Sequence, residues 1–236
     1  MFQTAHTLTE KTNSELTMNQ IKVLDLKKTI LADNDADAEK LRAELDAEHT
    51  FYLNVMSSPG SGKTSTILRM LSILGQSMRV GVLEADIDGD TDARAVMDVG
   101  VDAVQLHTGG MCHLDADMSR NSLKAIGSEN YDLIILENVG NLVCPAEFDT
   151  GAHKNLVILS VPEGDDKPLK YPLMFEKADA VCVNKIDAMP AFDFDMARFK
   201  QNVALRTAAP VFFISAATGE GIDALCGWLC DQMKQS

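Results

Sequence analysis

The sequence is poor in basic residues and has no long apolar run. Its 236 residues carry 21 lysines and arginines against 35 aspartates and glutamates, which gives a formal net charge of −14. Binding to nucleic acid requires a basic surface, so this balance argues against a nucleic-acid partner. No apolar run approaches the roughly 20 residues of a membrane-spanning helix. We therefore expect a protein that engages neither nucleic acid nor a membrane.

Cysteine is sparse as well. The chain has five cysteines, an odd number, and they are widely spaced. The first residues lack the basic segment and the apolar core of a secretory signal. Together these features predict a cytoplasmic protein in a reducing environment, whose thiols are either free or bound to metal.

The first 50 residues are polar and show no strand pattern. We expect residues 1–18 to be loosely structured. Apolar positions at helical spacing predict two short helices, over residues 21–31 and 35–47. Residues 1–50 are thus predicted to form a helical extension, and residues 51–236 a single domain.

From residue 51 onward, apolar strand-like runs alternate with helical patterns. The predicted strands are Phe51–Ser57, 79–85, 103–107, 133–139, 156–161, Ala180–Asn184 and 211–215. The predicted helices are 64–75, 91–99, 116–128, 193–206 and 221–234. The strand runs are rich in Val, Ile and Leu, as in strands covered on both faces. This order predicts an α/β fold, with a doubly wound, mainly parallel sheet of seven strands that binds ligands at its carboxyl edge.

The first loop after a predicted strand has the pattern of a P-loop. Ser57-Ser58-Pro59-Gly60-Ser61-Gly62-Lys63-Thr64 follows the strand and precedes a helix. Backbone N–H groups of such a turn bind phosphate oxygens, Lys63 reaches the β- and γ-phosphates, and the Thr64 hydroxyl binds Mg²⁺. The first motif position is Ser57 instead of glycine. The predicted nucleotide-binding residues here are Gly60, Ser61, Gly62, Lys63, Thr64 and Ser65.

Two later loops identify the base as guanine. Asn184-Lys185-Ile186-Asp187 resembles the N-K-x-D motif, in which a carboxylate accepts two hydrogen bonds from guanine. Adenine lacks that donor pair. Ser215-Ala216-Ala217 follows the next strand and resembles the second guanine-contact loop. The predicted base-binding residues are Asn184, Lys185, Asp187, Ser215, Ala216 and Ala217, and the predicted nucleotide is GTP.

Acidic residues at two other strand ends suit magnesium and catalysis. Glu137 ends a buried strand in the position of a Walker-B acid, and Asp86 ends the second strand. We expect Glu137 to hold Mg²⁺ or its bound water together with Thr64, and Asp86 either to contact Mg²⁺ or to orient the attacking water. We expect Gly140 to present its N–H to the γ-phosphate. The predicted catalytic residues are Lys63, Asp86 and Glu137. No glutamine occupies the position used by Ras-like GTPases, so we expect slow hydrolysis.

Thiol and imidazole side chains follow the third and fourth strands. Cys112, His113 and Cys144 are predicted at the same sheet edge, and such ligands suit Zn²⁺ and Ni²⁺. Three ligands do not complete a tetrahedral site, so a second chain would have to add more, or a position stays open. Lone cysteines are more often buried apolar residues, which is the preferred interpretation of Cys182 and of the pair Cys226 and Cys230.

Four segments together resemble the HypB family, the nickel-insertion GTPases of [NiFe]-hydrogenase maturation. They are residues 57–64, Cys112-His113-Leu114-Asp115-Ala116, the run Glu137-Asn138-Val139-Gly140-Asn141-Leu142-Val143-Cys144-Pro145, and Glu163-Gly164-Asp165-Asp166-Lys167-Pro168. The resemblance implies a SIMIBI-type P-loop GTPase that forms a GTP-dependent homodimer. It also implies a Ni²⁺ or Zn²⁺ site at Cys112, His113 and Cys144, the nickel metallochaperone HypA as partner, and delivery to the hydrogenase large subunit.

The chain departs from some members of that family. It lacks an N-terminal C-x-x-C-G-C motif and a histidine-rich stretch, so no nickel site is expected before Cys112. Two other functions remain open. The urease accessory GTPases have a Cys-Pro-His motif, whereas Cys112 and His113 are adjacent. A GTP-switched chaperone module would bind no transferable metal at all. Lys167 is either a residue that reaches a nucleotide across a dimer or a solvated surface lysine.

Overall fold

The computed structural model describes residues 26–86 and 91–235, and the side chains of residues 31–85 and 93–235. The expectations for residues 1–18, and for the side chain of Asp86, lie outside this part of the chain.

A seven-stranded sheet forms the centre of the described structure. Its spatial order is β3-β2-β4-β1-β5-β6-β7, and every pairing between neighbours is parallel. The strands are β1 (Phe51–Ser57), β2 (Val80–Asp86), β3 (Asp102–His107), β4 (Leu133–Glu137), β5 (Lys154–Ser160), β6 (Ala180–Asn184) and β7 (Val211–Phe213). The predicted doubly wound α/β sheet of seven strands is therefore confirmed, with all strands parallel.

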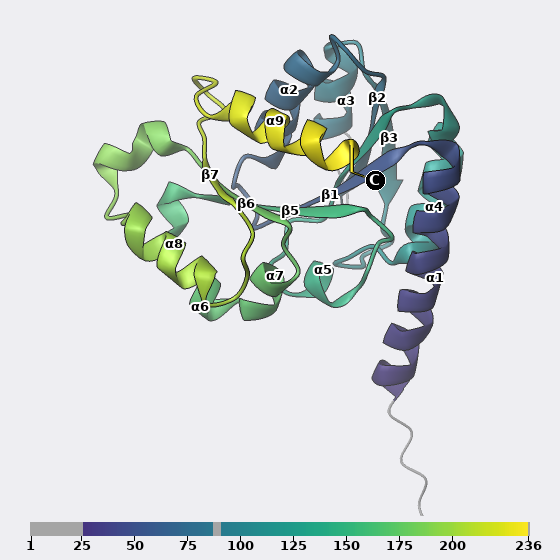
Figure 1. Cartoon of the computed structure of the whole chain (residues 1–236), viewed down its shortest axis with the longest axis horizontal. Coiled ribbons are helices and arrows are strands. Elements are labelled where there is room, and N and C mark those ends of the chain that lie inside the picture. The colour runs from purple at the N-terminus through teal and green to yellow at the C-terminus, as the bar shows by residue number, and fades with distance from the viewer. Residues whose placement is uncertain (1–25, 87–90, 236) are drawn as a thin grey trace, which may run out of the picture.

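Three helices cover one face of the sheet. They are α2 (Lys63–Leu74), α3 (Thr91–Asp98) and α9 (Ile222–Met233), which lie on the same side of the sheet in Figure 1. Alternate residues of β1, Phe51, Leu53 and Val55, pack with Ile67 of α2 and Leu225 of α9 in one apolar cluster. This alternation is what a strand between two helical layers produces, because successive side chains point to opposite faces.

The opposite face is covered in two parts. Helices α5 (Cys144–Glu147), α7 (Pro172–Glu176) and α8 (Met196–Ala204) pack near β5 and β6, with α6 (Lys167–Lys170) leading into α7. Helices α1 (Leu26–Glu48) and α4 (Ala116–Ile126) pack near β2 and β4. Short 3₁₀ turns at Ser128–Asn130, Val161–Glu163 and Ile186–Ala191 complete the connections.

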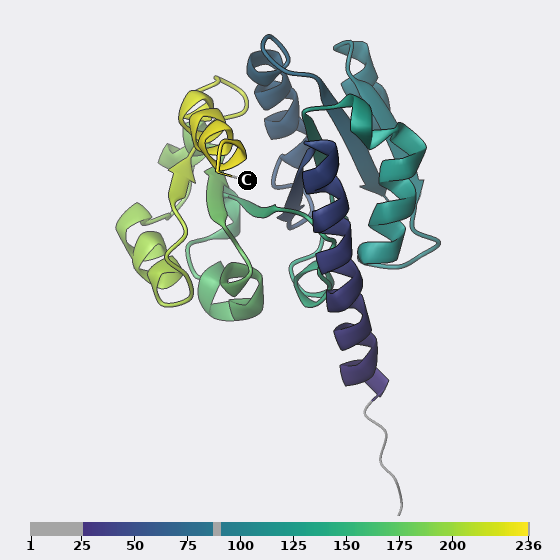
Figure 2. The same ribbon diagram turned by 45° about the vertical axis from the view of Figure 1, so that its right-hand side comes forward.

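The described part of the N-terminal extension, residues 26–50, contains one helix across the region where two were predicted. Helix α1 runs unbroken for 23 residues, because residues 31–35 contain neither glycine nor proline to end it. Figure 2 shows its C-terminal half beside α4 and its N-terminal end projecting past the sheet. Leu41 and Leu45 of α1 are buried against β1 and α4. No described helix is both long enough and apolar enough to cross a membrane.

The segment after β5 is attached to α8 by one buried carboxylate. Asp165 is 6% exposed; it pairs with Arg198 and accepts a hydrogen bond from the backbone N–H of Asp195 at 2.9 Å. The Arg198 guanidinium, more than the backbone bond, holds the pKa of this carboxyl below its usual value. The pairing therefore stabilises the folded state only while Asp165 is ionised.

We predict that Arg198→Ala lowers the free energy of unfolding at pH 7, because it removes a charge-assisted hydrogen bond to the buried Asp165 carboxylate. The folded pKa of Asp165 lies below the unfolded value of about 3.9. The difference from wild type should thus stay constant above pH 5 and shrink as the pH falls through the folded pKa. Urea unfolding at stepped pH measures it. Lys234→Ala, which removes an exposed pair with Asp231, should change stability less than Arg198→Ala does.

Candidate functional site

The P-loop connects central strand β1 to helix α2. Gly60 and Gly62 have φ angles of 74° and 89°, a region that glycine adopts without steric cost. Ser57, at the first motif position, is buried, and its hydroxyl donates to the carbonyl of Ser58 at 2.7 Å. Serine at this position thus adds a bond within the loop, and the two glycines keep the turn that α2 requires.

The N-K-x-D loop contacts the P-loop directly. The side-chain amide of Asn184 donates to the carbonyl of Ser61 at 3.0 Å, and its oxygen accepts from the N–H of Ala216 at 3.0 Å. The ammonium group of Lys185 donates to the carbonyl of Gly60 at 2.6 Å. One asparagine therefore joins the P-loop to the Ser215–Ala217 loop, so the three nucleotide motifs are held together as one unit.

A cavity of about 320 Å³ opens between these loops. It is lined by Gly62, Ser65, Asn184, Lys185, Asp187, Ala216 and Ala217. The Asp187 carboxylate is exposed and accepts from the Ser215 hydroxyl at 2.6 Å. The second carboxylate oxygen, and the remaining lone pair of the first, can accept hydrogen bonds from a ligand with two adjacent donors. Five of the seven lining residues are predicted base-binding positions, and the other two, Gly62 and Ser65, are predicted P-loop positions.

Glu137 brings together the residues predicted to act on magnesium and phosphate. Its Oε1 accepts from the Thr64 hydroxyl at 2.8 Å and lies 3.8 Å from the Lys63 ammonium. The Glu137 side chain is 5% exposed. A hydroxyl beside a carboxylate is a set of hard oxygen donors that fits Mg²⁺. Asp86 ends strand β2, and its side chain lies outside the described residues.

The loop after β4 touches the P-loop. A Cβ atom added at Gly140 would lie 3.3 Å from Cα of Pro59, so the two backbones approach closely. A chain of buried amides fixes the start of this loop: Asn138 donates to Asn54 at 3.1 Å, and Asn54 donates to Asn155 at 2.9 Å. This chain was not predicted, although Asn54, an amide within the otherwise apolar run at 51–56, is a signal for it in the sequence.

Two further contacts with the nucleotide loops were missed. Arg69 of α2 donates to the carbonyls of Ala216 and Ala217 at 2.7 and 2.8 Å. Glu163 accepts from the Ser58 hydroxyl and also from the N–H of Ser160. The Ser160-x-x-Glu163 pattern is a capping box that could have been read from the sequence. Both contacts hold the loops around the phosphate and base positions.

Lys167 lies at the start of α6. Its ammonium group is 5.5 Å from the centre of the Tyr171 ring, which is within the range of a cation–π interaction. Lys167, expected either to reach a nucleotide across a dimer or to be a solvated surface lysine, thus has an aromatic partner within its own chain.

The predicted thiol and imidazole ligands lie at the same edge of the sheet. Cys112 Sγ is 3.9 Å from His113 Nδ1. The pKa of the Cys144 thiol is raised, chiefly by a hydrogen bond with Cys112 and then by burial. The His113 ring stacks on Phe148 with centroids 3.8 Å apart, and burial lowers the pKa of His113. A neutral imidazole beside two thiols is a donor set that fits Ni²⁺ and Zn²⁺.

These groups do not form a complete metal cage in one chain. Within residues 26–86 and 91–235, no three His, Cys, Asp or Glu side chains are arranged to hold a metal ion. Cys182 and Cys226 are buried in the core, as expected, and burial raises the pKa of Cys226 to about 12. His153 accepts from the N–H of Tyr52 at 2.8 Å and lies 3.1 Å from Asp46, so both of its nitrogens are engaged.

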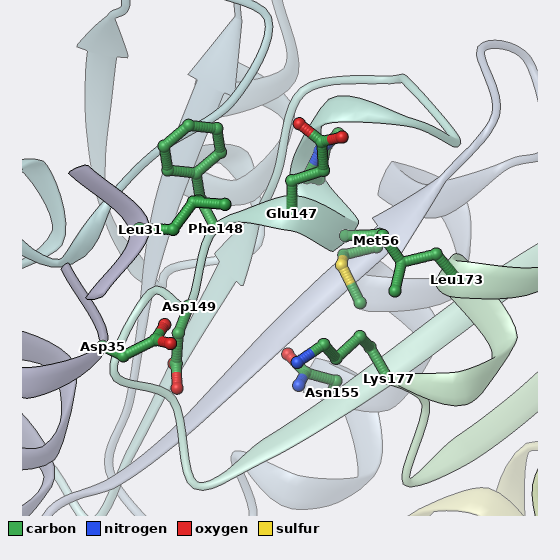
Figure 3. Close-up of a pocket in the computed structure, with 11 residues that line it drawn as sticks. Leu31, Asp35, Met56, Glu147, Phe148, Asp149, Asn155, Leu173 and Lys177 are labelled. Carbon is green, nitrogen blue, oxygen red and sulfur yellow. The ribbon is translucent and has the colours of Figure 1, made fainter. Parts of the chain in front are cut away.

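A second cavity, of about 350 Å³, lies next to α5, the helix that Cys144 begins. Figure 3 shows Leu31 and Asp35 of α1 on one side, Leu173 and Lys177 on the other, and Glu147, Phe148 and Asp149 along the segment between them. The cavity thus lies between α1 and α7, beside the segment that begins with Cys144.

The two P-loop glycines allow a matched test of this geometry. A Cβ atom at Gly62 would lie 2.5 Å from Nδ2 of Asn184, whereas a Cβ atom at Gly60 would meet nothing within 4 Å. Gly60→Ala should therefore cost only the left-handed backbone penalty, about 1 kcal/mol. Gly62→Ala should in addition displace Asn184 and abolish nucleotide binding. Binding of a fluorescent guanine nucleotide checks this, and equal affinity of the two variants would contradict the predicted contact.

Comparison with known proteins agrees with the motifs. The CobW/HypB/UreG nucleotide-binding domain matches residues 51–213. "Hydrogenase maturation factor HypB" of Rhizobium leguminosarum bv. viciae is 41% identical over 217 residues, which cover 90% of this chain and 71% of that protein.

Solved structures give the same result. The crystal structure of HypB from Helicobacter pylori in complex with nickel superposes with a TM-score of 0.81 at 38% identity, over 86% of this chain and 96% of that one. HypB from Archaeoglobus fulgidus gives 0.80 at 35% identity, over 86% and 100%. With a P-loop nucleotide-binding domain and this degree of similarity over most of its length, the chain belongs to the HypB family of hydrogenase maturation factors.

Proposed function

We propose that this protein binds and hydrolyses GTP to drive nickel delivery during the maturation of [NiFe]-hydrogenase. The observation that carries the proposal is the contact between Gly140 and Pro59. Cys144 lies four residues beyond Gly140 on the same segment. A γ-phosphate that draws Gly140 toward the P-loop would thus shift a metal ligand. The nickel complex of the Helicobacter pylori relative and the names of the relatives support the choice of metal and of process.

Guanine specificity would come from Asp187. Its exposed carboxylate borders the base cavity between Lys185 and the Ser215–Ala217 loop. The Ser215 hydroxyl holds it in place. A carboxylate in this position pairs with the N1–H and the exocyclic amine of guanine, and it would face acceptor or apolar groups of adenine.

Hydrolysis would use the group around Glu137. Lys63 would neutralise the β- and γ-phosphates, and the Thr64 hydroxyl with Glu137 and Asp86 would hold Mg²⁺, which supplies charge neutralisation at the transferring phosphoryl group. Ser57, Ser58 and Glu163 fix the loop beneath the phosphates. No described side chain takes the role of the Ras glutamine, so we expect slow turnover until a second chain or a partner completes the site.

Nickel would be bound as cargo by Cys112, His113 and Cys144, and Zn²⁺ by the same ligands. Because the described residues of one chain do not arrange three ligands as a group, the site would be completed in a GTP-dependent homodimer. The proposed partners are the nickel metallochaperone HypA, which would supply the metal, and the hydrogenase large subunit, which would receive it. Release to a partner requires affinity that changes with the nucleotide.

A second function is a GTP-switched chaperone module without a transferable metal. The lack of a preformed three-ligand group among the described residues favours it. The two functions differ in metal stoichiometry, because the module predicts no stoichiometric Ni²⁺ or Zn²⁺.

We predict that Asp187→Asn lowers GTP affinity by about 100-fold or more, because the amide presents donors to the donors of guanine. Xanthosine triphosphate should bind better to the variant than GTP, because its base has a carbonyl where guanine has an amine. Calorimetric titration with both nucleotides measures this. The exposed Asp193→Asn serves as control and should bind GTP as wild type does; unchanged GTP affinity in Asp187→Asn would remove the base assignment.

We predict that Ni²⁺ binds with different affinity in the presence of GDP and of a non-hydrolysable GTP analogue. We also predict that Cys112→Ala and Cys144→Ala each lower the Ni²⁺ affinity by about tenfold or more and leave GTP binding unchanged. Equilibrium dialysis with metal analysis measures both effects. Cys230→Ala, on α9 and remote from these loops, should match wild type. Identical curves with the two nucleotides would remove the coupling, and unchanged stoichiometry in both cysteine variants would remove the site.

A further inference from the structure

Asn34 is a polar residue on the packing face of helix α1. It is spaced with Ala38, Leu41 and Leu45 so that all four lie along one stripe of the helix. The other three are buried apolar residues, and Asn34 is half-buried. An amide in such a stripe costs stability unless its donor and its acceptor are both satisfied.

Both groups of the Asn34 amide are hydrogen-bonded to backbone. The side-chain oxygen accepts from the N–H of Ala116 at 2.9 Å. The side-chain nitrogen donates to the carbonyl of Asp149 at 2.9 Å. These bonds span 82 and 115 residues of sequence, so α1 contacts two segments that lie far from it in the chain.

The two bonded groups lie close to the candidate metal ligands. Ala116 is the first residue of α4 and follows His113 by three residues. Its N–H is one of the donors that a helix N-terminus leaves unpaired. Asp149 follows Cys144 by five residues. One segment comes from the end of β3 and the other from the end of β4.

Neighbouring contacts strengthen the same connection. Arg42, two turns along α1, makes a two-pronged pair with the Asp149 carboxylate at 2.9 and 3.0 Å and donates to the carbonyl of Ala152. Phe148, next to Asp149, stacks on the His113 ring. Figure 3 shows Phe148 and Asp149 pointing to different sides of their segment. The segment thus contacts α1 through Asp149 and the imidazole through Phe148.

We propose that Asn34 is a positioning residue for the metal site: through its two backbone bonds it holds the Cys112–His113 segment and the Cys144 segment in mutual register. It touches no metal and acts through the ligand-bearing loops. The inference rests on the proposed function, because it assigns a role toward the same three ligands. It also gives the N-terminal helix a part in metal binding, although the helix carries no ligand of its own.

The experiment titrates the full chain with NiCl₂ and follows the near-ultraviolet absorption of the thiolate–Ni²⁺ bonds together with bound metal. Asn34→Ala should weaken Ni²⁺ binding by about tenfold and change the absorption per bound Ni²⁺ at saturation. Asn34→Asp keeps the acceptor for Ala116 and loses the donor to Asp149, and should also change the absorption. GTP affinity should match wild type in both variants.

Two controls separate positioning from stability. Leu45→Ala destabilises the packing of α1 without touching either bond, and should leave the absorption per bound Ni²⁺ unchanged. Lys40→Ala, on the exposed face of α1, should match wild type throughout. Wild-type affinity and absorption in both Asn34 variants would overturn this inference alone, as would an equal change in Leu45→Ala. A wild type that binds no Ni²⁺ would overturn the proposed function and this inference together.

Discussion

The parallel pairing of β1 between β4 and β5 is the constraint on which the rest of the structure depends. Because all seven strands run in one direction, every loop that leaves a carboxyl end lies at the same edge of the sheet. The P-loop leaves the central strand and is contacted there by the loops that follow β4, β5 and β6. Those contacts reach its backbone at Pro59, its hydroxyl at Ser58 and its carbonyls at Gly60 and Ser61. The loop is therefore held in shape by its neighbours in the chain itself.

Hydrogen bonds between side-chain amides in the sheet stabilise the start of the loop after β4. Asn54 and Asn138 are 1% and 0% exposed. The Asn138 amide donates a hydrogen bond to Asn54, and the Asn54 amide donates one to Asn155, so the chain links the end of β4 to β1 and β5. An apolar residue at Asn54 would leave a buried amide without a partner, at a cost of about 1–3 kcal/mol. The chain of amides thus makes one arrangement of the β4 loop more stable than its alternatives.

The sequence predicted the strands, the longer domain helices α2, α3, α4, α8 and α9, and the motif loops, because these depend on periodicity and on short patterns. The short helices α5, α6 and α7 were not predicted, because four or five residues carry too little periodicity. Strands β1 and β6 have the predicted bounds. The helix from Leu26 was predicted as two, because a polar stretch at residues 32–35 resembles a loop when its packing partners are unknown. The hydrogen bonds made by Asn34, Arg69 and Glu163 were not predicted, because each joins positions that are far apart in the chain. A single side chain carries no periodic signal, and only the folded topology selects its partner.

Nucleotide and metal are linked in both directions under the proposed function. If a γ-phosphate at Gly140 changes the affinity of Cys144 for nickel, then bound nickel must change the preference for GTP over GDP by the same factor. The segment between them is short, and Asn34 and Arg42 hold its far end to α1. The segment would then be held at Asp149 by α1 and moved at Gly140 by the γ-phosphate, so it could not shift as a whole. The displacement would then fall on the residues between them, and Cys144 is the proposed metal ligand among those residues.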